Sequence, residues 1–170
     1  MAKKAKDKNK SKKKGEVEPG PETDPFVLFK NYSKQCESVG ITFHESVKRA
    51  LCFNENENSS FQLLIGEDEE NSSSKPLGSW GCRALVMAIL GKCNHENATK
   101  YTAFKEIRIW RSNIGDHGAM AIGRLLREAG PEFNISLLEL SDNNIGFEGA
   151  QALGRSLCAG VRDNMIHDVG

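Results

Sequence analysis

The sequence has no long apolar segment. Its longest fully apolar run, Ala84–Leu90, has seven residues, whereas a helix that crosses a bilayer needs about 20. No apolar stretch follows the lysines near the N-terminus, so we expect neither a secretory signal nor a membrane span.

Cysteine is scarce and unevenly placed. There are five cysteines, and no two of them have CxxC spacing. An odd number without paired spacing predicts reduced thiols in the cytosol or the nucleus rather than a disulfide framework. Cys93 and His95 could supply two metal ligands, but no second pair follows at zinc spacing, so we expect no metal and no cofactor.

Catalytic motifs are also lacking. Neither phosphate-binding pattern, GxGxxG or GxxxxGK[ST], is present, and no Ser/His/Asp or Cys/His arrangement has a recognisable local context. The acidic run 67–70 does not follow the EF-hand pattern and is interpreted as a solvated loop. We therefore expect a protein that is not an enzyme.

The charge is neutral overall but strongly uneven. Residues 1–14 hold eight lysines and one aspartate, while the rest of the chain holds 15 basic and 22 acidic residues. This tail has three interpretations: a solvated disordered end, attachment of Lys3–Lys14 to an acidic surface such as a tubulin tail, nucleic acid or acidic lipid, and nuclear import through Lys12–Lys14. Without aromatic residues for stacking, any nucleic-acid contact would be non-specific and salt-sensitive.

Three segments are predicted: a disordered tail over 1–25, a helical N-terminal cap over 26–60 and a repeat region over 61–170. The tail is too poor in apolar residues to offset the entropy of ordering. Two helices are expected within 26–53. The first carries an apolar stripe at helical spacing, made of Phe29, Tyr32, Cys36 and Val39.

The second of these helices is expected to begin at a capping box formed by Thr42 and Glu45. It presents Val47, Ala50 and Leu51 as its apolar face. After a polar loop, the short apolar run Phe61–Ile65 is suited to a buried strand.

Internal self-similarity is the strongest signal in the sequence. A shift of 31 residues superposes nine positions of compatible type without a gap. These pairs are Phe104/Ile135, Ile107/Leu138, Ile109/Leu140, Ile114/Ile145, Gly115/Gly146, Gly118/Gly149, Ala119/Ala150, Ile122/Leu153 and Leu126/Leu157. A shift of 37 superposes an earlier copy, in which Leu77, Gly78, Gly81, Leu85 and Ile89 match Ile114, Gly115, Gly118, Ile122 and Leu126.

Each copy consists of a period-two apolar stretch, glycines and a helical stripe, which predicts a strand, a tight turn and a helix. One such unit cannot close a core, but stacked units place their strands in a parallel sheet with helices outside. Gly118 and Gly149 are expected to let the helices approach the strand layer closely. Cys82 aligns with Ala119 and Ala150 and is expected to fill the core at a close helix contact.

Residues 104–157 resemble two leucine-rich repeats of the ribonuclease-inhibitor type, LxxLxLxxNxIGxxGAxxL, and the similarity extends over about 61–170. The second copy keeps the asparagine of the motif as Asn143, whereas the first has Ser112 there. In that family the asparagine side chain bonds the turn backbone, so the resemblance implies a weaker ladder at the first copy.

The resemblance implies an α/β horseshoe segment with parallel strands inside, helices outside, a helical N-terminal cap and a disordered basic tail. The copies are expected over 61–90, 104–126 and 135–157, with a partial fourth at 166–170 that suggests a truncated isoform, a fragment, or a partner that supplies the missing cap. Family members are chiefly protein binders, which implies a scaffold or adaptor in the cytoplasm, at the cytoskeleton or cilium, or in the nucleus. The alternative is a GTPase activator or another catalytic regulator.

The strand positions between the apolar ones are the candidate binding residues. In parallel register Arg108 faces Glu139 and Arg111 faces Asp142, which is either a solvated charge ladder or a recognition surface. Trp110 has small Ser141 as its expected neighbour, so its indole either stands exposed as a partner anchor or packs on a neighbouring side chain or strand. The candidate partner-binding residues are Glu106, Arg108, Trp110, Arg111, Glu139 and Asp142.

Overall fold

A computed structural model describes residues 20–53, 61–66, 75–93, 98–130 and 132–162 as a mixed α/β fold. The expected lysine tail up to residue 19, the acidic run 67–70, His95 and the partial repeat 166–170 lie outside these residues. In chain order the elements are α1 (Pro25–Ser38), α2 (Glu45–Cys52), β1 (Gln62–Gly66), α3 (Gly78–Ile89), β2 (Glu106–Trp110), α4 (Gly115–Glu128), β3 (Leu137–Glu139) and α5 (Phe147–Arg162).

The three strands form a parallel sheet in the order β1-β2-β3. Between β2 and β3 the register is the predicted shift of 31, which places Arg108 opposite Glu139. The run Phe61–Ile65 was expected to be the strand of the earliest copy, and β1 lies there, displaced by one residue. Strand order therefore follows chain order, as stacking of successive units requires.

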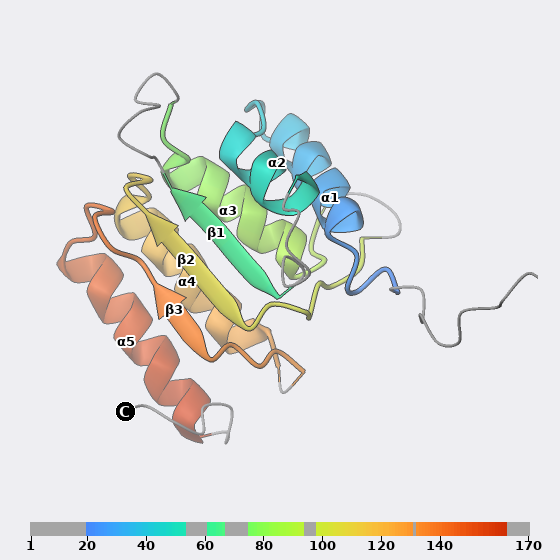
Figure 1. Cartoon of the computed structure of the whole chain (residues 1–170). Coiled ribbons are helices and arrows are strands. Elements are labelled where there is room, and N and C mark those ends of the chain that lie inside the picture. Colours follow the sequence, from blue (N-terminus) through green and yellow to red (C-terminus); the bar gives the residue numbers. More distant parts are fainter. Residues whose placement is uncertain (1–19, 54–60, 67–74, 94–97, 131, 163–170) are drawn as a thin grey trace, which may run out of the picture.

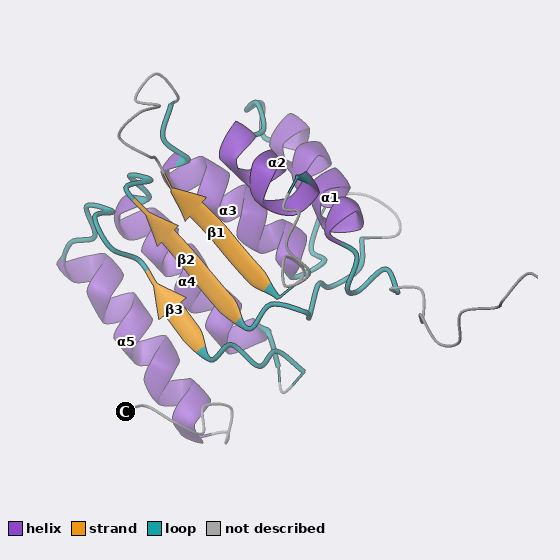
Figure 2. Cartoon of the chain, viewed as in Figure 1, coloured by secondary structure: helices purple, strands orange, loops and turns teal. Residues whose placement is uncertain are grey.

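Helices α3 and α4 cover one face of the sheet, α5 lies beside β3, and α1 and α2 lie at the β1 end (Figures 1 and 2). Along β1 and β2 buried and half-buried residues alternate, because successive strand side chains point to opposite faces. The core therefore lies between the sheet and the helices. Its strand contribution is Leu63, Ile65, Ile107 and Ile109, each at most 1% exposed.

The second glycine of each IGxxG-like sequence has a different role from the predicted one. A Cβ at Gly81 or Gly118 would come closest to the aliphatic side chain four residues earlier, Leu77 or Ile114. A Cβ at Gly149 would come closest to Asp116 of α4 and would also crowd Ile145. These glycines therefore make room for neighbouring side chains, and the closest contacts are not with the strand layer.

The turns that follow β2 and β3 have the same backbone geometry. Arg111 and Asp142 have φ of 46° and 53°, and Asn113 and Asn144 have φ of 48° and 54°. Each pair is separated by the 31-residue shift, and the left-handed region is uncommon for residues other than glycine. The repeat is therefore present in the backbone conformation as well as in the apolar pattern.

Backbone hydrogen bonds join neighbouring units at these turns. The Gly78 N–H donates to the Ser112 carbonyl at 2.9 Å, and the Gly115 N–H donates to the Asn143 carbonyl at 2.9 Å. Gly78 and Gly115 are the first residues of α3 and α4, where the N–H has no acceptor within its own helix. Each unit thus satisfies the first amide of the helix before it.

Asn143 is the side chain that ties the second turn to the first. It is 2% exposed; its Oδ1 accepts from the Ser112 N–H at 3.0 Å, and its Nδ2 donates to the Ile109 and Ser141 carbonyls at 2.6 and 3.1 Å. The Ser112 hydroxyl instead donates within its own turn, to the Trp110 carbonyl at 2.9 Å.

The N-terminal helices differ from expectation in two details. Residues 20–24, assigned to the tail from sequence, form a turn, and the Asp24 carboxylate accepts from the Phe26 N–H to cap α1. The predicted capping box at Thr42 is wrong, because the cap of α2 is His44, whose Nδ1 accepts from the Ser46 N–H at 3.2 Å. Glu45 is consequently the first helical residue and not the third.

Burial in these two helices follows the predicted stripes with two exceptions, Val39 and Phe29. The side chains of Tyr32, Cys36, Val47 and Leu51 are buried as expected, whereas Val39 follows the end of α1 and is 42% exposed. Burial also shifts along α1, because Leu28 is buried while its neighbour Phe29 is half-buried.

Candidate functional site

The strand face opposite the helices carries the predicted binding residues. On β2 the half-buried side chains Glu106, Arg108 and Trp110 alternate with buried Ile107 and Ile109. The sheet positions them because α3 and α4 occupy the other face (Figure 2). We call this the strand face, and it consists of Gln62, Leu64, Glu106, Arg108, Trp110, Leu137 and Glu139.

Arg108 is the centre of a charge network on the strand face. Its guanidinium lies 3.5 Å from Glu106 Oε2 on its own strand and 3.7 Å from Glu139 Oε2 on β3. The predicted pairing of Arg108 with Glu139 is confirmed. The Arg108 side chain is 40% exposed, and exposed pairs of this kind contribute only about 0.2–1 kcal/mol to stability.

Polar side chains extend this network to all three strands. The Gln62 amide on β1 donates to Glu106 Oε2 at 3.1 Å, and the Ser141 hydroxyl donates to Glu139 Oε1 at 3.0 Å. Each carboxylate is therefore held in place by one neighbour besides Arg108.

Arg111 and Asp142 are brought together, but not on the strands. They lie 3.6 Å apart in the turns after β2 and β3, both with positive φ. Their pairing confirms the predicted register, while their location differs from the predicted strand positions because the chain bends into the left-handed region at each of them.

The indole of Trp110 packs against β1. Gly66 is its register partner on β1, and a Cβ on Gly66 would overlap the indole ring. Trp110 was expected either to stand exposed or to pack on a neighbour, and the side of the ring that faces β1 is packed. The residue is nevertheless only half-buried, so a partner can still reach the ring.

A shallow cavity of about 210 Å³ adjoins Trp110 at the β1 end of the strand face. It is lined on one side by Leu64 and Gly66 of the strand and on the other by Ser46, Arg49 and Ala50 of α2. Sequence reasoning did not identify Arg49, because no pattern in the sequence indicates which turn of α2 meets the edge of the sheet.

The thiols of Cys82 and Cys93 lack the low pKa of reactive cysteines. Burial raises the pKa of the Cys82 thiol to about 12 and that of Cys93 to about 11, with the nearby Cys36 adding to the second shift. Reactive cysteines need a lowered thiol pKa. Cys82 is fully buried with its sulfur 3.7 Å from the Gly118 carbonyl, which confirms its predicted place in the core.

In the part of the chain that the structure describes, no three His, Cys, Asp or Glu side chains are grouped in a way that could hold a metal ion. Within the same residues, no helix combines the length and the apolar composition that crossing a bilayer requires.

Comparison with known proteins gives no family assignment, since neither a protein-family model nor a curated protein matches the chain.

Proposed function

We propose that this chain is a leucine-rich-repeat protein of the ribonuclease-inhibitor type, a segment of an α/β horseshoe that acts as a non-enzymatic scaffold or adaptor. In this proposal a protein partner binds across the strand face. The support for the fold is the recurrence of the strand, the left-handed turn and the glycine that accommodates an aliphatic side chain at the 31-residue shift.

The observation that carries the binding proposal is the combination of Trp110 and Arg108 on the strand face. Tryptophan and arginine are the residue types most enriched in interface hot spots. Here both are partly exposed, both project from β2, and both are held by neighbours on the adjacent strands. A surface held in this way loses little side-chain entropy when a partner binds.

Proximity labelling with the full chain tests this proposal and can identify the partner. We expect Trp110→Ala to weaken labelling of strand-face partners at least tenfold, whereas Trp80→Ala, on the helical side of the molecule, leaves it within twofold. Purified partners are then titrated against each variant, and circular dichroism shows that each variant is folded. Equal affinity of folded Trp110→Ala and wild type overturns the proposal.

The lysine tail supplies a separate proposal about location. Lys3–Lys14 would attach the protein to an acidic surface such as tubulin tails, placing it at the cytoskeleton or a cilium. Co-sedimentation with microtubules, with and without residues 1–14, tests this. Loss of binding on deletion supports the proposal, and equal sedimentation of both forms overturns it without affecting the strand face.

A further inference from the structure

A second surface lies on the opposite side of the molecule, where helices α1, α3 and α4 meet. Two depressions of about 190 and 120 Å³ share Arg83, Met87 and Arg124 and therefore form one continuous groove. We call it the helical groove. Its main lining residues are Val39, Trp80, Arg83, Met87, Met120 and Arg124.

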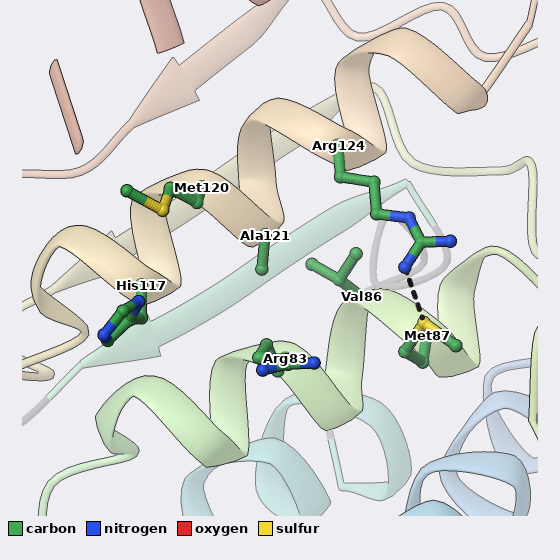
Figure 3. Close-up of a pocket in the computed structure, with 7 residues that line it drawn as sticks. All are labelled: Arg83, Val86, Met87, His117, Met120, Ala121 and Arg124. Atoms are coloured by element: carbon green, nitrogen blue, oxygen red, sulfur yellow. Dashed lines mark hydrogen bonds between the residues drawn. The ribbon is translucent and has the colours of Figure 1, made fainter. Parts of the chain in front are cut away.

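The floor of the groove is apolar and adaptable. Figure 3 shows Val86 of α3 and Ala121 of α4 facing one another between the helices, while Arg124 reaches across from α4 to Met87. Unbranched methionine side chains such as Met87 and Met120 adjust to different apolar groups. Because a cavity of about 150 Å³ can take up a benzene ring, the larger depression has room for a leucine-sized or phenylalanine-sized side chain.

The rim of the groove is positively charged. Arg83 is exposed, and its guanidinium carbon lies 5.3 Å from the centre of the Trp80 ring. Arg124 shares the carboxylate of Glu128 with Lys92, and these two cations lower the pKa of Glu128. Among the described residues that line the groove, none is acidic.

The α1 end of the groove presents an exposed aromatic ring. Trp80 is 59% exposed, and Arg83 lies against its ring. Because tryptophan is enriched in interface hot spots, this ring offers an apolar contact next to the arginine.

We propose that the helical groove binds an acidic peptide segment of another protein, with apolar side chains in the two depressions and carboxylates against Arg83 and Arg124. Each depression is smaller than the 300–1,000 Å³ typical of small-molecule pockets, and two in a row suit successive side chains of a peptide. This site is independent of the strand face.

Selection from a phage-displayed library of random 12-residue peptides against the full chain tests the proposal. We expect the recovered groove binders to carry at least two apolar residues flanked by Asp or Glu. Synthetic versions should bind Arg83→Glu at least tenfold more weakly than wild type. Arg155→Glu is a matched charge reversal at an exposed position of α5, and its affinity for these peptides should lie within twofold of the wild-type affinity.

Tryptophan fluorescence separates the two surfaces, since the chain has one tryptophan on each. In a Trp110→Phe background only Trp80 reports, and its emission should shift when the acidic peptide binds, while Arg108→Glu leaves the affinity unchanged. The proposal is overturned if no recovered peptide binds wild type with higher affinity than it binds Arg83→Glu. A Trp80 response to phosphatidylserine vesicles but not to acidic peptides overturns it in favour of a membrane.

Discussion

Asn143 combines near-complete burial with three hydrogen bonds to neighbouring backbone. Its Oδ1 accepts from the Ser112 amide and its Nδ2 donates to the Ile109 and Ser141 carbonyls; the first two hydrogen bonds are buried and the third is partly buried. Ser112 has a shorter side chain, and its hydroxyl bonds only within its own turn. One residue thus carries much of the side-chain connection between the last two units.

Asn143→Ala should lower the free energy of unfolding by about 3 kcal/mol, because three hydrogen bonds, two of them buried, are lost at about 1 kcal/mol each. Urea denaturation measures this. The control is Asn134→Ala, at an exposed position, which should change stability by less than about 0.5 kcal/mol. Equal stability of the two variants would show that the turn does not depend on Asn143.

Gly66→Ala should displace the Trp110 indole, since a Cβ at this position occupies the space of the ring. In a Trp80→Phe background, in which Trp110 is the only tryptophan, the emission maximum should move to longer wavelength as the ring is pushed into water. An unchanged spectrum would mean that the indole does not rest on Gly66.

At the scale of elements, the helices are capped by their neighbours in the stack. The Asp116 carboxylate near the start of α4 accepts from the Gly146 and Gly149 amides at 2.7 and 3.0 Å, at the start of α5. An oxygen at a helix N-terminus satisfies amides that have no partner within the helix. Gly149 permits this approach, because a Cβ there would lie 2.6 Å from Asp116 Oδ1.

Asp116→Ala should therefore destabilise α5 more than α4, by about 1 kcal/mol, as for loss of a helix cap. Asp116→Asn retains an acceptor oxygen and should lose less than half as much. Hydrogen exchange of the α5 amides measures the difference. Equal exchange in the wild type and Asp116→Ala would contradict the cap.

The sequence predicted the parts of this fold that follow from local pattern, and it missed those that depend on side-chain direction. The shift of 31 placed Arg108 opposite Glu139 because parallel register follows directly from repeat length. The packing of the Trp110 indole was left open, since periodicity does not indicate whether a side chain leans toward the preceding or the following strand. At His44, an imidazole replaced the expected threonine cap, and no residue spacing signals that choice.

The helical groove was missed for a related reason. Its residues come from three helices, with Val39 and Gln35 on or beside α1 and the rest on α3 and α4. The only local signal was Trp80 three residues before Arg83, a spacing that places both side chains on one face of a helix. This spacing does not indicate whether another element covers that face.

Across the whole molecule, two thiols and two tyrosine hydroxyls are buried in their neutral forms. Burial raises the pKa of Cys82 from 9.0 to about 12 and that of Cys93 to about 11, and it also raises the pKa of Tyr32 and Tyr101. In the unfolded chain these groups lose their protons at lower pH than in the folded protein. The folded state is therefore favoured fully below pH 9 and progressively less above it.

The free energy of unfolding should fall between pH 8 and pH 10.5, as measured by urea denaturation at both values. Cys82→Ala removes one of the contributing thiols, so the fall should be smaller in this variant whatever its stability at pH 8. A stability that is constant or rises over this range would contradict the burial of these groups.

The fold rests on the stacking of successive strand–turn–helix units, and amide hydrogen exchange measured by NMR tests this stacking directly. Gly78 and Gly115 are the first residues of α3 and α4. Their amides donate to the carbonyls of Ser112 and Asn143, which lie in the next unit. We predict that both exchange as slowly as the amides of β2. Exchange at the rate of an exposed helix end would show that the units are not joined as described.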